Sequence, residues 1–158
     1  MSTIEHEDRL ADAKRQGQAQ FDSIKDMIDI LRTAETSTRE NQDAHRDVNE
    51  ALERIQEDAL SIEVRGGWHA PGAAREDTGP VEYKILLCTG GPACQIVGDL
   101  SEHGEPETAR LQVQDWFQPW TEFRPIVGYC GEGKSGYATY DSEKTLLAYA
   151  RCFYFGEG

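Results

Sequence analysis

The sequence predicts an α+β fold, in which an N-terminal helical hairpin or coiled coil precedes an antiparallel β-sheet with a C-terminal helix. The first observation is compositional. Residues 1–60 contain one glycine and no proline, tryptophan or tyrosine, whereas all six prolines, three tryptophans and six tyrosines lie beyond residue 61. The second is the helical spacing of apolar residues before residue 60, and the third is apolar–polar alternation after it. We therefore expect a helical region at 1–60 and a small α+β domain at 61–158.

The first predicted helix carries a heptad pattern. From Leu10 onward, apolar residues and Gly17 recur every seven positions, and further apolar residues lie four positions beyond them. This alternating spacing is typical of a coiled-coil seam, in which a narrow apolar stripe is buried between helices. We expect a homodimer through this stripe, which consists of Leu10, Phe21, Ile24, Ile28 and Leu31.

A second helix is predicted after the first. Its apolar residues have helical spacing but do not continue the first register, and they are Ala44, Val48, Leu52, Ile55 and Ala59. Between the two runs, residues 33–38 are rich in Thr and Ser, whose side chains compete with helical hydrogen bonds. Ser37 and Glu40 match a capping box. We therefore favour a hairpin, with a break between Ala34 and Thr38, over one long helix with a phase slip.

Four strands are predicted in the second region from alternating, β-branched stretches. They span residues 61–65, 81–87, 94–98 and 110–117. The glycine-rich turn at 89–92 indicates that the second and third strands form a hairpin. An apolar segment at 143–153 predicts a helix that covers one face of the sheet, with Asp141 or Ser142 as its cap.

The charge of the chain excludes several functions. It carries 29 acidic and 16 basic residues, and its formal net charge is −13. Such a chain is a poor ligand for nucleic acid or an anionic membrane, because both are polyanions. The longest aliphatic run, at 85–87, is too short to span a bilayer. The first residues lack a basic segment followed by an apolar one, so we expect no secretory signal and a location in the cytoplasm of a bacterial host cell.

Enzymatic motifs are weak. Residues 128–135 match the phosphate-binding pattern G-x-x-x-x-G-K-[ST], but Pro125 spoils the preceding strand and few residues follow Ser135, so we interpret this segment as a glycine-rich loop. The cysteines show no C-x-x-C pair, and no metal-binding spacing is present. A nucleophilic thiol at Cys88, Cys94 or Cys130 would need a histidine base. We expect no enzyme activity, no cofactor and no metal.

Two features are candidate sites for a protein partner. Acidic residues on the second helix fall along one side over roughly 25 Å, and they are Glu40, Asp43, Asp47, Glu50 and Glu57. Arg46 and Arg54 interrupt this row, so a simple solvated face is the alternative. Trp116 and Trp120 lie in an aromatic run that either packs in the core or exposes an anchor for a partner.

Three segments, at 85–93, 114–120 and 148–157, resemble small proteins of bacteriophages and other bacterial mobile elements. The resemblance implies a setting in which small acidic proteins bind and block host machinery, including CRISPR complexes. Our leading hypothesis is a non-enzymatic, anti-CRISPR-like inhibitor of a host protein or ribonucleoprotein complex with a basic surface, which does not itself bind nucleic acid. The alternatives are a phage assembly protein that oligomerises through its N-terminal helices and, third, a small thiol hydrolase.

Overall fold

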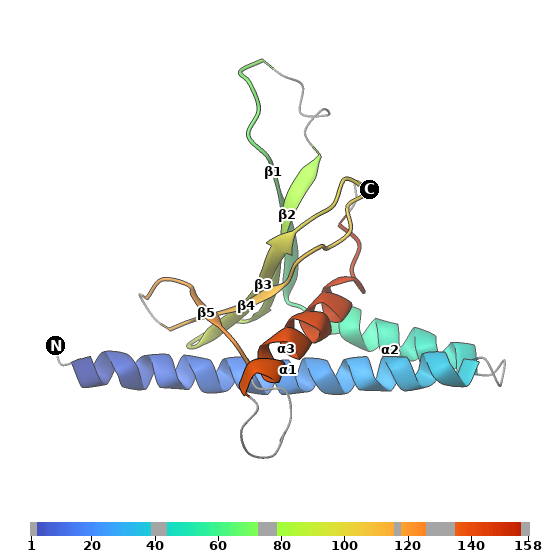
Figure 1. The fold of residues 1–158 in the computed structure, drawn as a ribbon, viewed down its shortest axis with the longest axis horizontal. Helices are drawn as coiled ribbons and strands as arrows, with labels where there is room; N and C mark the ends of the chain where they lie inside the picture. Colours follow the sequence, from blue (N-terminus) through green and yellow to red (C-terminus); the bar gives the residue numbers. More distant parts are fainter. Residues whose placement is uncertain (1–2, 39–43, 73–78, 116–117, 126–134, 156–158) are drawn as a thin grey trace.

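The computed structural model describes residues 3–38, 44–72, 79–115, 118–125 and 135–155, of which 3–9, 38, 44 and 135–141 are described as backbone only. Within them it confirms the α+β fold (Figure 1). The elements are α1 (Thr3–Thr38), α2 (Ala44–Asp58), β1 (Ser61–Gly66), β2 (Pro80–Cys88), β3 (Ala93–Asp99), β4 (Arg110–Gln114), β5 (Thr121–Phe123) and α3 (Ser135–Ala150).

The first two helices form the predicted hairpin, in which α2 runs back alongside α1 (Figure 1). The break lies later than predicted, because α1 continues through the Thr- and Ser-rich segment. There Thr33 Oγ1 donates a hydrogen bond to the carbonyl of Asp29 at 2.8 Å, and Ser37 Oγ donates to that of Thr33 at 3.0 Å. Hydroxyls bonded one turn back are compatible with a helix interior. Ser37 is therefore not the cap of α2, and Glu40 lies outside the described residues.

The strands form one antiparallel sheet in the order β1-β2-β3-β4-β5. The predicted hairpin of β2 and β3 is confirmed, and Gly90 at its turn has a φ of 97°, a conformation that glycine adopts without strain. The fourth predicted strand is confirmed as far as Gln114. The short strand β5 was not predicted, since it has only three residues in an aromatic-rich run.

One hydrophobic core joins the two predicted regions. The face of the sheet that carries Ile85, Ile96 and Val113 packs against α1 and α3. Gly17 allows the closest approach, because a Cβ there would lie 2.6 Å from Cγ1 of Val113 and 2.9 Å from Cδ1 of Phe123. The glycine that interrupts the apolar stripe of α1 is therefore where the helix meets the sheet.

The apolar stripe of α1 is used inside this chain. Phe21, Ile24, Ile28 and Leu31 are between 0% and 6% exposed in the single chain, and Leu10 is half-buried. A coiled-coil dimer through these side chains would have to displace the chain's own sheet and second helix. The homodimer itself stays a prediction, and it needs a different surface.

The C-terminal helix begins earlier than predicted. Since α3 starts at Ser135, Asp141 and Ser142 lie inside it and neither is its cap. The C-terminal end of α3 contacts α2, where Tyr149 Oη donates a hydrogen bond to Oδ2 of Asp58 at 2.9 Å. Of the phosphate-loop pattern only Ser135 is described, and the antiparallel sheet differs from the parallel setting that this motif requires.

Candidate protein-binding groove on the helical hairpin

The structure places part of the predicted acidic row on the surface of α2. Asp47, Glu50 and Glu57 are exposed there, whereas Glu40 and Asp43 lie outside the described residues. Glu50 is partly neutralised by an exposed ion pair, in which its Oε1 lies 3.3 Å from Nε of Arg46. Exposed pairs of this kind contribute little to stability, so the carboxylate remains available to a partner.

Two of these residues line a groove between α1 and α2. The groove has a volume of about 540 Å³. Its α1 side is formed by Asp29, Ile30, Thr33, Ala34 and Ser37, and its α2 side by Asp47, Glu50, Ala51 and Arg54. It therefore lies between helices that the chain itself holds together, rather than in a loop.

The groove exists because the hairpin is built from small residues at this point. Ala34 and Ala51 are buried between the helices and offer only methyl groups. Ile30, by contrast, is 48% exposed, although most isoleucines whose burial the structure describes are buried. It lies next to Leu31 of the apolar stripe but outside that stripe. The groove thus combines a small-residue floor with an exposed branched side chain.

The rim of the groove is acidic. Asp29, Asp47 and Glu50 supply three carboxylates to the groove, against the guanidinium of Arg54 in its lining and that of Arg46 beside Glu50. An apolar floor with a negative rim matches the chemistry of lysine and arginine, which have an aliphatic stem and a cationic head. It does not match a phosphate, which the carboxylates would repel.

Trp120 belongs to a separate site. It is half-buried and lines a depression of about 400 Å³ together with Glu63, Lys84 and Gln95. These residues alternate with core residues such as Ile85, so they lie on the sheet face that points away from the helices. Trp116 lies outside the described residues. The two features predicted to bind a partner are therefore not brought together into one surface.

Sequence reasoning missed four residues that line the groove. Asp29, Ile30, Ala34 and Ala51 were not singled out as site residues. A signal was present for Ile30, because it is a large apolar residue that does not fit the heptad positions of its own helix. The alanines carried no such signal, since alanine is common throughout helices.

Burial affects two of the described thiols, and Cys130 lies outside the described residues. Cys88, Cys94 and Cys152 are free. Burial, reinforced by the neighbouring Cys88, raises the pKa of Cys94 far above its usual range, and burial raises the pKa of Cys152 to about 11. Both thiols are therefore protonated at neutral pH, whereas the reactive form is the thiolate. Among the described residues, no group of three His, Cys, Asp or Glu is placed to hold a metal ion.

Comparisons with known proteins do not assign the chain. No protein family, no curated protein and no solved structure matches it. None of the helices in the described part of the chain has an apolar stretch long enough to cross a bilayer.

Proposed function

We propose that this chain is a non-enzymatic binding protein whose hairpin groove holds a basic segment of a host protein. The observation that carries the proposal is the exposed Ile30 in a groove that Asp29, Asp47 and Glu50 also line. An isoleucine exposed in this way stabilises the fold little, but it offers a partner apolar contact beside charge. A basic amphipathic helix or loop supplies both complements.

The net charge supports the same class of partner. At −13, the chain attracts cationic surfaces over long distances and repels nucleic acid. Proteins that handle nucleic acid carry basic surfaces, because they neutralise phosphates with lysine and arginine. We therefore propose that the chain covers such a surface on a host protein or ribonucleoprotein complex and inhibits it. The resemblance to proteins of bacteriophages agrees with an anti-CRISPR-like role of this kind.

The test is capture of partners from a bacterial lysate with matched variants. We expect the unmodified chain to retain a basic, nucleic-acid-handling complex at low salt and to lose it at high salt, since screening weakens exposed charge pairs. Reversing charge in the groove with Asp47→Lys and Glu50→Lys, or removing its apolar contact with Ile30→Ala, should reduce recovery at least tenfold.

The control reverses charge elsewhere. Glu102 and Glu105 are exposed and lie far from the groove residues in the chain, so Glu102→Lys with Glu105→Lys changes the net charge equally. Recovery should persist with this control. Equal loss with both pairs would mean that only net charge matters and would contradict the groove. The purified complex should also lose nucleic-acid binding when the unmodified chain is added, and unchanged binding would contradict inhibition.

A further inference from the structure

The exposed apolar side chains of this molecule gather at one edge of the sheet. Seven large apolar residues are exposed in the described part of the chain, and five of them belong to β1, its flanks or the start of β2. These five are Leu60, Ile62, Val64, Trp68 and Val81. Trp68 is the most exposed of them, at 105% of its reference accessible surface.

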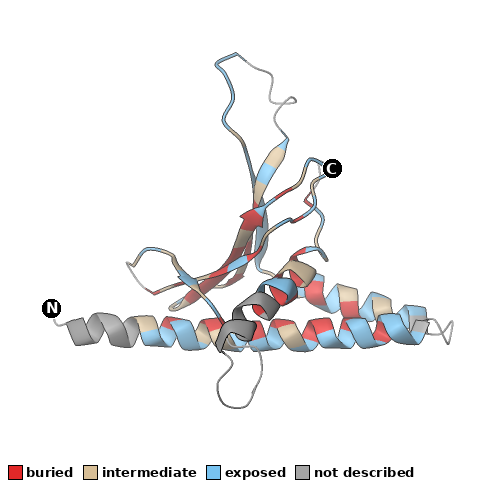
Figure 2. Ribbon diagram, viewed as in Figure 1, coloured by how far each residue is buried: buried red, intermediate tan, exposed pale blue. Residues whose placement is uncertain are grey.

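Ile62 and Val64 lie on the core-facing side of the sheet. Ile62 is paired with Ile85 and Val64 with Tyr83, and both partners are buried in the core. The helices do not extend over this end: β1 and the start of β2 project away from them, and Figure 2 shows this arm mainly in exposed and intermediate classes. The arm therefore presents an apolar face that the described part of the chain leaves uncovered.

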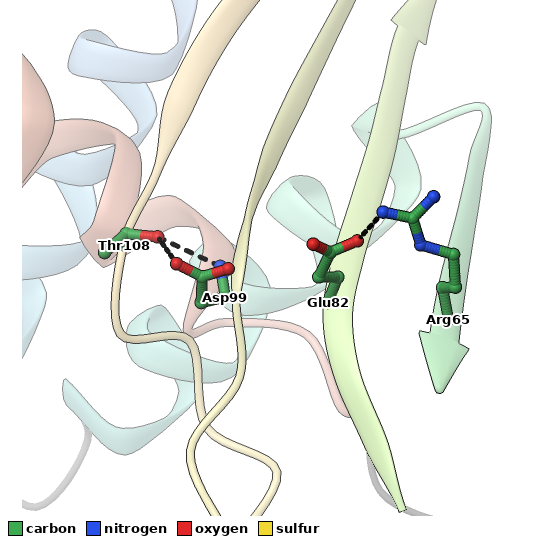
Figure 3. Close-up of polar contacts among 4 residues, drawn as sticks. All are labelled: Arg65, Glu82, Asp99 and Thr108. Carbon is green, nitrogen blue, oxygen red and sulfur yellow. Dashed lines mark hydrogen bonds and ion pairs between the residues drawn. The ribbon is translucent and has the colours of Figure 1, made fainter. Parts of the chain in front are cut away.

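The opposite face of the arm carries ordered charges. Arg65 forms an ion pair with Glu82 across the two strands (Figure 3), and Nζ of Lys84 lies 3.4 Å from Oε2 of Glu63. Along β1 the charges are thus negative at 63 and positive at 65, on either side of Val64. This order is self-complementary, because an antiparallel copy of the strand presents the same charges in reverse.

We propose that β1 pairs with β1 of a second copy of this chain, antiparallel and centred on Val64. In this register Val64 lies opposite itself, and Glu63 lies opposite Arg65 of the second copy. Across the four strands the outer face then reads Lys84, Glu63, Arg65 of the second copy and Glu82 of the second copy, with alternating charge at every step. Opposite charges in directly paired positions stabilise antiparallel strands.

Neighbouring registers fit less well. Centring the pair on Glu63 or on Arg65 places two like charges opposite each other, which is destabilising. If the two-fold axis instead passes between two residues of β1, polar residues lie opposite apolar ones, because the side chains alternate between the two faces. At the Val64 register Ile62 and Val64 of both copies share one face of the sheet. The pairing also closes an open sheet edge with two-fold symmetry.

The first test is disulfide cross-linking. Directly opposed residues in antiparallel strands have Cα atoms about 4.5–5.5 Å apart, which is within the range of a disulfide. Val64→Cys should therefore form a covalent dimer on mild oxidation. The matched control is Ile62→Cys on the same face, where the two thiols are offset by four residues, or about 13 Å. Equal cross-linking of both variants, or of neither, would overturn the register.

The second test exchanges charges and measures mass by light scattering. The unmodified chain should have about twice the mass of the 17.7 kDa monomer, and a monomeric mass would overturn the proposal. Arg65→Glu should abolish the dimer, because it opposes Glu63 of the second copy. The fourfold exchange that restores every pair should recover it, and it combines Glu63→Arg, Arg65→Glu, Glu82→Arg and Lys84→Glu. Failure to recover the dimer in a folded fourfold variant would overturn the proposal.

This dimer does not rest on the hairpin groove. Its test residues lie on β1 and β2, whereas those of the groove lie on α1 and α2. If both proposals hold, the dimer presents two grooves, and a partner with repeated basic segments is bound more tightly than by one groove.

Discussion

The two ends of the same sheet differ in how they are covered. At β3 and β4 the core-facing side chains, such as Ile96 and Leu111, are at most 1% exposed beneath the helices. At β1 the equivalent side chains Ile62 and Val64 are 42% and 49% exposed. The strands β1 and β4 show the same apolar–polar alternation. The alternation therefore determines that a strand has one apolar face, whereas the length and placement of the helices determine whether the chain itself covers that face.

This difference predicts unequal costs for the same substitution. Ile85 and Ile62 are register partners on one face, but Ile85 is fully buried and Ile62 is not. Ile85→Ala should lower the free energy of unfolding by about 2–5 kcal/mol, because it leaves a cavity in the core. Ile62→Ala should cost less than about 1 kcal/mol in the monomer. Urea unfolding at low protein concentration measures both. Equal costs would mean that the arm is buried in solution even in the monomer.

A second prediction concerns the contact that covers the far end of the sheet. Gly17→Ala should destabilise the chain by about 1–3 kcal/mol, because the new methyl group overlaps Val113 and Phe123. The higher helix propensity of alanine offsets at most about 1 kcal/mol. The control on the arm is Gly67→Ala, whose methyl group would meet Val81 at an ordinary 3.7 Å and should change stability little. If Gly17→Ala stabilises the chain, α1 does not pack this closely on β4.

Much of this fold was predictable from local patterns. The strands were found because alternation and turn glycines act over a few residues, and the hairpin because its two apolar runs differ in register. Ser37 misled the prediction, since a hydroxyl that caps a helix can equally bond to a carbonyl one turn back. The C-terminal helix was placed too late for a similar reason, because Ser142 is an acceptable cap that instead lies within α3.

The candidate sites were less predictable, because they depend on what covers each face. The spacing of Ile24 and Ile28 showed that this stripe of α1 is buried. It did not show whether the stripe packs against a second copy of the chain or against the chain's own sheet. The groove depends on the packing of α1 on α2, which brings Ile30 and Asp47 into the lining of one groove. The sequence identified Asp47 and Glu50 from charge alone. It could not associate them with residues that are distant in the chain.

The third prediction concerns the hydrogen bond that joins α3 to α2 at the covered end of the sheet. Tyr149→Phe removes the hydrogen bond to Asp58 and should cost about 1–2 kcal/mol at pH 8. Burial, and then the nearby Asp58, raise the pKa of Tyr149 above its usual value of about 10. The folded chain therefore keeps this proton at a pH where the unfolded chain releases it. The stability that Tyr149 contributes in this way is fully present below pH 10 and declines as the pH rises above it.

Because phenylalanine does not ionise, Tyr149→Phe does not lose stability in this way as the pH rises above 10. The difference in unfolding free energy between the unmodified chain and Tyr149→Phe should therefore shrink above pH 10. Unfolding measured at pH 8 and at pH 10.5 compares the two proteins, and the other ionising groups cancel in the difference. A difference that stays constant would mean that Tyr149 is not buried at this site.

The smallest effect is on reactivity rather than stability, and it contrasts a thiol beside the covered end with one on the arm. With a pKa of about 11, Cys152 should react with iodoacetamide slowly at pH 7, and about tenfold faster for each pH unit up to that value. A cysteine introduced on β1 by Ser61→Cys is exposed and should have an ordinary pKa of about 8.5. It should therefore react about two orders of magnitude faster at pH 7. Peptide mass spectrometry measures the reaction rate at each site separately. Similar rates would mean that the end of α3 opens readily and that Cys152 is not kept buried in solution.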